Sequence, residues 1–190
     1  MSDAPETRRE QAPALLVRGL AAFGRACLRV PRAAGAFAAI AWCAYLWWMS
    51  DDPGLQAGPR VGPNAVLHNL AHVPAFGLLA LLLAIALPRR AGWAVTEWGA
   101  LRGVWAITVL YGVVDELHQG RVPNRDGSLI DVLSDAIGAA MLLLLARYAG
   151  GPHADARELR RVLVFGTAAS VASAIASTFV PAMFPTVRWL

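Results

Sequence analysis

The sequence predicts an all-α membrane protein: a polytopic transmembrane helical bundle of about five spans, preceded by an amphipathic helix at the membrane surface. The first reason is composition. Of the 190 residues, 57% are hydrophobic and 16% are charged, whereas about 25% charged residues are usual in soluble domains. The second reason is that several apolar segments are each close to the roughly 20 residues that a helix needs to cross a bilayer. These segments are residues 34–50, 65–87, 99–118, 129–148 and 162–184.

The N-terminal region, residues 1–33, precedes these segments. Apolar residues recur there at helical spacing from Leu16 to Val30, and arginines fall on the opposite side. This pattern predicts a basic amphipathic helix that lies on the membrane surface. A secretory signal peptide is the alternative, since arginines precede an apolar run. However, no small-residue cleavage site follows Trp47 and Trp48, so the first span is expected to be retained.

Polar connections divide the rest of the chain. Residues 34–148 hold four spans and are expected to form one transmembrane domain. Residues 149–161 are expected to form a basic cytoplasmic connection, and residues 162–190 the fifth span and a short tail. The loops between the first four spans are rich in Gly, Pro and polar residues, which favour turns.

The arginines indicate an orientation. All 17 basic residues are arginines, and most lie in the N-terminal region or beside the connections that follow the second and fourth spans. The loops 51–64 and 119–128 carry only Arg60, Arg121 and Arg125. By the positive-inside rule, the N-terminus is expected in the cytoplasm and these two loops outside. These arginines give the chain a pI near 9.8. Contact with anionic membrane lipids is the expected role of this positive charge, and no nucleic-acid partner is expected.

Ionisable and polar residues concentrate at the outer ends of three predicted spans. The second span begins with His68 and His72, the third ends in DELHQ (115–119), and the fourth begins with Asp131 and Asp135. At 1.5 Å rise per residue, all of them lie within about two helical turns of one interface. The sequence therefore predicts one outward-facing polar pocket. Its expected ligand-binding residues are His68, His72, Asp115, Glu116, His118, Gln119, Arg121, Arg125, Asp131 and Asp135.

Helical spacing also predicts which way the fourth span faces. Asp131 and Asp135 share one face, and that face continues into Gly138 and Ala139. Small residues let another helix approach closely, so the carboxylates are expected to point into the bundle.

Some of these residues have a purely structural explanation. Ser128 and Asp131 fit a helix capping box, and Asp126-Gly127 favours a turn. The whole group could also be an ion-pair network that only fastens three helices together. A histidine pair one turn apart can bind a metal. Because no third ligand is evident from the sequence, hydrogen bonds to the carboxylates are expected, with no metal and no cofactor.

Three stretches of residues 40–146 carry a family resemblance. They are HNLAHVPAFGLL (68–79), DELHQ (115–119) and VPNRDGSLIDVLSDAIGA (122–139). In this order they resemble the VanZ-like family, small bacterial membrane proteins named after a teicoplanin-resistance protein. The chain departs from the family where Asp-Lys commonly precedes the first histidine, because Val66-Leu67 stand there. The resemblance implies a helical domain of the bacterial cytoplasmic membrane and possible teicoplanin-type resistance, but no particular reaction.

Three functions stay open at this point. The first is binding or protection of a cell-envelope lipid, a lipid-linked cell-wall precursor or a lipoglycopeptide, with Arg121 and Arg125 holding a phosphate or carboxylate. The second is an enzyme that modifies a phospholipid or lipid-phosphate headgroup, since paired acids and histidines can supply a general acid and base. The third is a small proton-coupled transporter. The confinement of the polar residues to one side of the membrane argues against a proton relay.

Overall fold

The computed structural model describes residues 6–51, 63–89, 97–123, 125, 127–150 and 156–179. Within these ranges the regular secondary structure consists of six α-helices joined by turns and loops. The helices are α1 (Glu6–Arg29), α2 (Arg32–Ser50), α3 (Pro63–Ala86), α4 (Trp98–Gln119), α5 (Leu129–Gly150) and α6 (Ala156–Phe179). The all-α prediction is confirmed.

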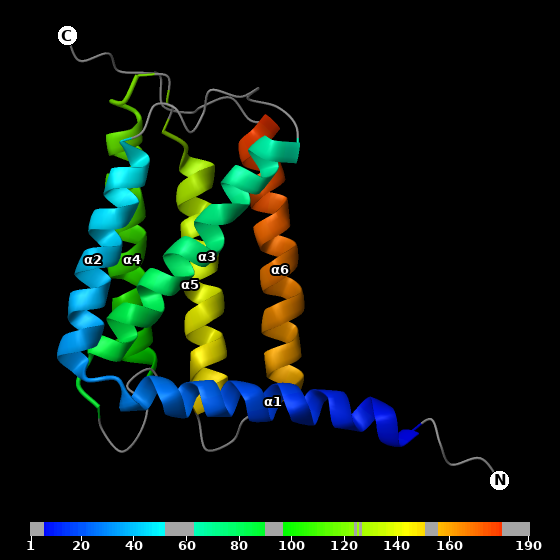
Figure 1. The fold of residues 1–190 in the computed structure, drawn as a ribbon. Coiled ribbons are helices and arrows are strands. Elements are labelled where there is room, and N and C mark those ends of the chain that lie inside the picture. Colours follow the sequence, from blue (N-terminus) through cyan, green and yellow to red (C-terminus); the bar gives the residue numbers. More distant parts are fainter. Residues whose placement is uncertain are drawn as a thin grey trace.

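Helices α2 to α6 form a bundle, and α1 lies across one of its ends (Figure 1). Helix α5 occupies the centre, because it contacts α3, α4, α6 and α1. Helix α3 runs obliquely, from the side of α6 toward α2 and α4 (Figure 1). We call the end of the bundle opposite α1 the distal end. There α2, α4 and α6 finish, and α3 and α5 begin.

Four helical segments among the described residues are long and apolar enough to cross a membrane: Arg32–Ser50, Val66–Ala86, Leu129–Tyr148 and Ala156–Phe179. The protein is therefore a polytopic helical membrane protein. The predicted third span, α4, is not among the four, although its 22 residues lie in the same bundle. It is less apolar because it carries Arg102, Asp115 and Glu116.

The sixth helix begins earlier than the apolar segment that predicted it. Hydropathy placed the start of the last span at residue 162, whereas α6 starts at Ala156. The first turns contain Glu158 and Arg161, which form an ion pair at 2.5 Å. Part of the expected connection 149–161 is therefore helical, because charged residues propagate a helix as well as apolar ones do.

Close packing of α3 against α5 holds the centre of the bundle together. A Cβ atom on Gly138 would overlap the backbone of Val73, and one on Gly77 would lie 3.1 Å from the carbonyl oxygen of Gly138. This contact confirms that the small-residue face of α5 points into the bundle. Large apolar side chains such as Phe37 and Phe165 are instead exposed on the outside, as expected for surfaces that face lipid.

Arginines gather at the end that α1 crosses. Arg89 donates a hydrogen bond of 2.6 Å to the carbonyl oxygen of Val30, and Arg32 donates one of 3.2 Å to that of Ala86. The guanidinium of Arg147 lies 4.2 Å from the ring centroid of Trp98. The first two contacts fasten the corner between α1 and α2 to the end of α3, and the third joins α5 to α4.

Candidate functional site

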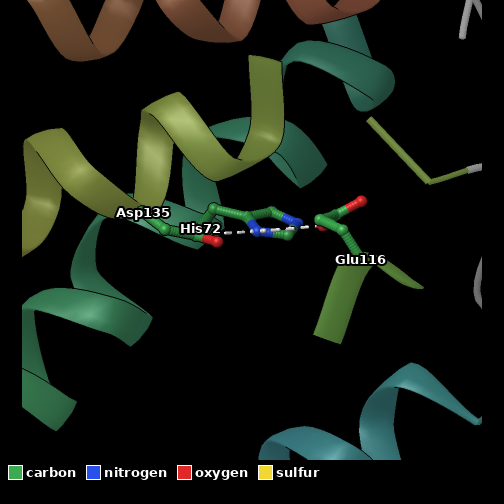
Figure 2. Close-up of side chains that lie close together, drawn as sticks. All are labelled: His72, Glu116 and Asp135. Atoms are coloured by element: carbon green, nitrogen blue, oxygen red, sulfur yellow. Dashed lines mark hydrogen bonds and ion pairs between the residues drawn. The ribbon is translucent and has the colours of Figure 1, made fainter. Parts of the chain in front are cut away.

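Three ionisable side chains meet near the distal end, one from each of three helices. His72 of α3 lies between Glu116 of α4 and Asp135 of α5 (Figure 2). The Nδ1 atom of His72 is 3.0 Å from Oδ1 of Asp135 and 4.0 Å from Oε1 of Glu116. The two carboxylates are 2% and 0% exposed, and the histidine side chain is 11% exposed. We call these three residues the His–Glu–Asp cluster.

The helices are shaped to admit this cluster. Gly112 precedes Glu116 by one turn on α4, and a Cβ atom there would lie 2.6 Å from Oδ2 of Asp135. Glycine therefore leaves the room that the carboxylate occupies. On α3, the ring of Phe76 is nearly parallel to that of His72, with their centroids 6.1 Å apart. The aromatic neighbour and the hydrogen bond to Asp135 together fix the orientation of the imidazole.

Each carboxylate of the cluster has one oxygen with a hydrogen bond and one without. The Oε2 atom of Glu116 accepts a hydrogen bond of 2.8 Å from the backbone N–H of Ser128. The Oε1 atom of Glu116 and the Oδ2 atom of Asp135 are buried and accept no hydrogen bond from the described residues. An unsatisfied buried acceptor costs about 1–3 kcal/mol, and more if it is charged. The cluster therefore offers two acceptor oxygens to a donor or a cation.

A second polar group, the Asp115 network, lies beside the cluster, and hydrogen bonds join its members. Asp115 accepts hydrogen bonds from Ser50 (2.6 Å) and Gln119 (2.9 Å). Arg125 donates to Oε1 of Gln119 at 3.1 Å and to the carbonyl oxygen of Met49 at 2.9 Å. All four side chains are buried. This network joins the end of α2 to the end of α4 and to the following loop.

The start of α5 combines a cap with a link to the cluster. The hydroxyl of Ser128 accepts hydrogen bonds from the backbone N–H groups of Ile130 and Asp131, so the expected cap is present. In a capping box, the Asp131 carboxylate would accept the N–H of Ser128. Glu116 takes that N–H instead, and Asp131 accepts a hydrogen bond from Ser177 of α6.

The other expected site residues lie around these two groups. The half-buried ring of His68 is edge-on to that of His72, with centroids 6.2 Å apart. His118 stacks on Trp47 at 3.8 Å and is 3.6 Å from Asp51. Arg121 is exposed. Asp126, expected in a turn, lies outside the described residues.

The structure adds polar residues that the sequence reasoning did not select. Ser50 belongs to the Asp115 network, and Ser177 bonds Asp131. For Ser177, the sequence did contain a pattern that could have indicated its role. Ser170, Ser173 and Ser177 recur at helical spacing on α6, and Ser173 also receives a hydrogen bond of 2.9 Å from Ser134 of α5. Ser50 carried no comparable signal, because it is a single hydroxyl at the end of an apolar helix.

An apolar groove of about 400 Å³ lies between α3, α5 and α6. Its lining includes Leu67, Ala71 and Pro74 of α3, Met141 of α5 and Val171 of α6. Ala71 lines the groove, whereas the next residue, His72, belongs to the cluster. Helix α3 therefore presents an apolar groove on one side and the polar cluster on the other.

Comparison with known proteins gives one match. The profile of the family described as VanZ/LLP1 matches residues 34–150. Neither a curated protein nor a solved structure matches the chain. The matched range contains α2 except its first two residues and all of α3 to α5, and with them the whole His–Glu–Asp cluster and the Asp115 network.

Proposed function

The chain belongs to the VanZ/LLP1 family, and from this premise we propose that it binds the polar headgroup of a cell-envelope amphiphile at the distal end. The ligand class comprises membrane phospholipids, lipid-linked cell-wall precursors and lipoglycopeptides. The observation that carries the proposal is the His–Glu–Asp cluster. Ionisable groups inside an apolar bundle are unfavourable, and they mark ligand or ion sites in membrane proteins.

The apolar groove supports an amphiphile in preference to a water-soluble ligand. Leu67, its lining residue nearest the distal end, directly precedes His68. An acyl chain in the groove would lie along α3 and bring its headgroup beside the histidine-bearing part of that helix. Arg121 is exposed in the loop that follows α4, and it can contact an anionic headgroup from the water side.

Lipid analysis of the purified protein tests the proposal. The wild-type chain, extracted in mild detergent and analysed by native mass spectrometry, is expected to retain one class of envelope lipid. Two variants should lose it: Glu116→Gln, which keeps the shape of the side chain, and Ala71→Trp, which fills the groove. Arg161→Gln, at the α1 end, is the control and should retain the lipid. A wild-type protein without bound lipid, or equal retention in all variants, would refute the proposal.

An enzyme acting on the same headgroup is the second candidate. The specific observation in its favour is the 3.0 Å hydrogen bond between His72 and buried Asp135, with Glu116 on the other side. A carboxylate that orients a histidine is a common arrangement for a general base. Turnover of labelled phospholipid in proteoliposomes, lost in His72→Ala, would establish catalysis. Retention of lipid without turnover would leave binding as the function.

We also propose that the protein resides in a bacterial cytoplasmic membrane with the α1 end toward the cytoplasm. The arginines at that end, including Arg32, Arg89 and Arg102, support this orientation by the positive-inside rule. The distal end, with the His–Glu–Asp cluster, would then face the outside, where cell-wall precursors and lipoglycopeptides are encountered.

A further inference from the structure

We propose that the His–Glu–Asp cluster binds a divalent transition-metal ion of the zinc type. The proposal stands independently of the headgroup, because the protein side chains alone would hold the ion. From the sequence, no metal was expected because His68 and His72 lacked a third ligand. The fold supplies carboxylates from two other helices, Glu116 of α4 and Asp135 of α5.

The spacing of the ligand atoms fits a single ion. One ligand atom from each of the three residues lies within 4.8 Å of the other two. Nitrogen and oxygen ligands bind Zn²⁺ at about 2.1 Å, so two ligands of a tetrahedral ion are about 3.4 Å apart. The distances from Nδ1 of His72, 3.0 Å to Asp135 and 4.0 Å to Glu116, lie on either side of this value. Small side-chain rotations would therefore complete the site.

The buried oxygens supply a second, independent observation. An ion pair made only of these side chains would leave Oε1 of Glu116 and Oδ2 of Asp135 unsatisfied, because neither accepts a hydrogen bond from the described residues. A dication would interact with both carboxylates. The other carboxylate oxygen of Glu116, Oε2, accepts a hydrogen bond from the backbone N–H of Ser128. Hydrogen bonds of this kind orient ligating carboxylates in metal sites.

The ligand set indicates the class of metal. Imidazole with carboxylates suits Zn²⁺ and its neighbours, whereas Mg²⁺ and Ca²⁺ prefer sites made of oxygen alone. Three protein ligands leave a fourth position of a tetrahedral ion for water or another small group, as in catalytic zinc sites. A phosphate or carboxylate oxygen of a headgroup could occupy that position. The metal would thus favour anionic headgroups over neutral ones.

Metal titration of the purified chain tests the inference. After removal of metal with a chelator and exchange into lipid-free detergent, the wild type is expected to bind one Zn²⁺ per chain by isothermal titration calorimetry. Affinity should fall at least tenfold in Asp135→Asn and Glu116→Gln. The control is Asp51→Asn, which alters an exposed carboxylate at the same end of the bundle. Absence of binding by the wild type, or equal affinity in all four proteins, would overturn the proposal.

A spectroscopic measurement on the wild type avoids reliance on variants that fold poorly. Co²⁺ replaces Zn²⁺ and absorbs strongly in the visible range when it has four ligands, but weakly when it is octahedral. The Co²⁺-loaded wild type is expected to show the strong absorption, and Zn²⁺ should abolish it by competition. A weak, octahedral spectrum would contradict the proposed four-coordinate site. Because these measurements use no lipid, a negative result would not affect the proposed headgroup binding, and absence of lipid would not affect metal binding.

Discussion

The space beside Gly112 of α4 controls the geometry of the His–Glu–Asp cluster. Gly112 faces Asp135 so closely that a methyl group would lie 2.6 Å from Oδ2. Gly112→Ala should therefore displace the carboxylate and destabilise the protein by about 1–3 kcal/mol. Thermal unfolding in detergent measures the effect. Gly103→Ala is the matched control on the same helix, because a methyl group there meets open space and alanine favours a helix. Equal melting temperatures for the two variants would contradict this role of Gly112.

The two arginines that the sequence assigned to one pocket lie in different surroundings. Arg125 is 4% exposed and bonds Gln119 and Met49, whereas Arg121 is exposed. Replacement of Arg125 leaves buried acceptors unpaired, at about 1–3 kcal/mol for each. We expect Arg125→Met to lower the melting temperature by several degrees and Arg121→Met to leave it nearly unchanged. A large effect of Arg121→Met on lipid retention, with normal stability, would indicate that the exposed arginine contacts ligand.

Sequence reasoning found the cluster residues but not their grouping. His72, Glu116 and Asp135 were all among the expected ten, because each falls near the same end of its helix. Asp115 and Gln119 are one helical turn apart on α4, and they are hydrogen-bonded to each other. The separation of Glu116 from Asp115 into a different group depends on which neighbours the two faces of α4 meet. Those neighbours are determined by the packing of α2, α3 and α5 around α4. The periodicity of one helix does not show how other helices pack against it.

At the scale of the elements, hydropathy located the helices well and their ends less well. The predicted segment 34–50 corresponds to α2 (Arg32–Ser50) and the segment 99–118 to α4 (Trp98–Gln119). The start of α6 was placed too late, since the turn that contains Glu158 is charged. Apolar content reports where a helix can face lipid. A helix can extend beyond that region, and its polar turns then have to be recognised from ion pairs and helix propensity.

The crossing of α3 and α5 depends on contact between backbones. A side chain on Gly138 would meet the main chain of Val73, which cannot rotate away. Gly138→Ala should therefore push the two helices apart and disturb His72 and Asp135, which lie on them. The comparison is Gly166→Ala, whose methyl group would meet the flexible side chain of Met141. Circular dichroism melts in detergent should show a clearly larger loss of stability for Gly138→Ala. A larger loss for Gly166→Ala would mean that this crossing tolerates separation.

At the scale of the whole molecule, the proposed orientation makes opposite predictions for the two ends. In a chain with Cys27→Ala and Cys43→Ala, single cysteines can replace exposed Asp51 at the distal end or exposed Arg25 on α1. A membrane-impermeant maleimide should label Asp51→Cys in intact cells. It should label Arg25→Cys only after the membrane is opened. The reverse pattern would place the cluster at the cytoplasmic face, and would redirect the search for its ligand to the inner leaflet.

The orientation also determines whether the family's association with teicoplanin applies to this chain. Teicoplanin carries a lipid tail, so it suits a site with a polar cluster on one side of α3 and an apolar groove on the other, whereas vancomycin lacks such a tail. In a sensitive Gram-positive host, the wild type is expected to raise the inhibitory concentration of teicoplanin but not of vancomycin. At matched membrane levels, Glu116→Gln and Ala71→Trp should abolish this protection, and Arg161→Gln should keep it. Equal protection by all variants would mean that neither side of α3 handles the drug. If none of them protects, teicoplanin is excluded as the ligand, and the lipid retained by the purified protein becomes the better guide to it.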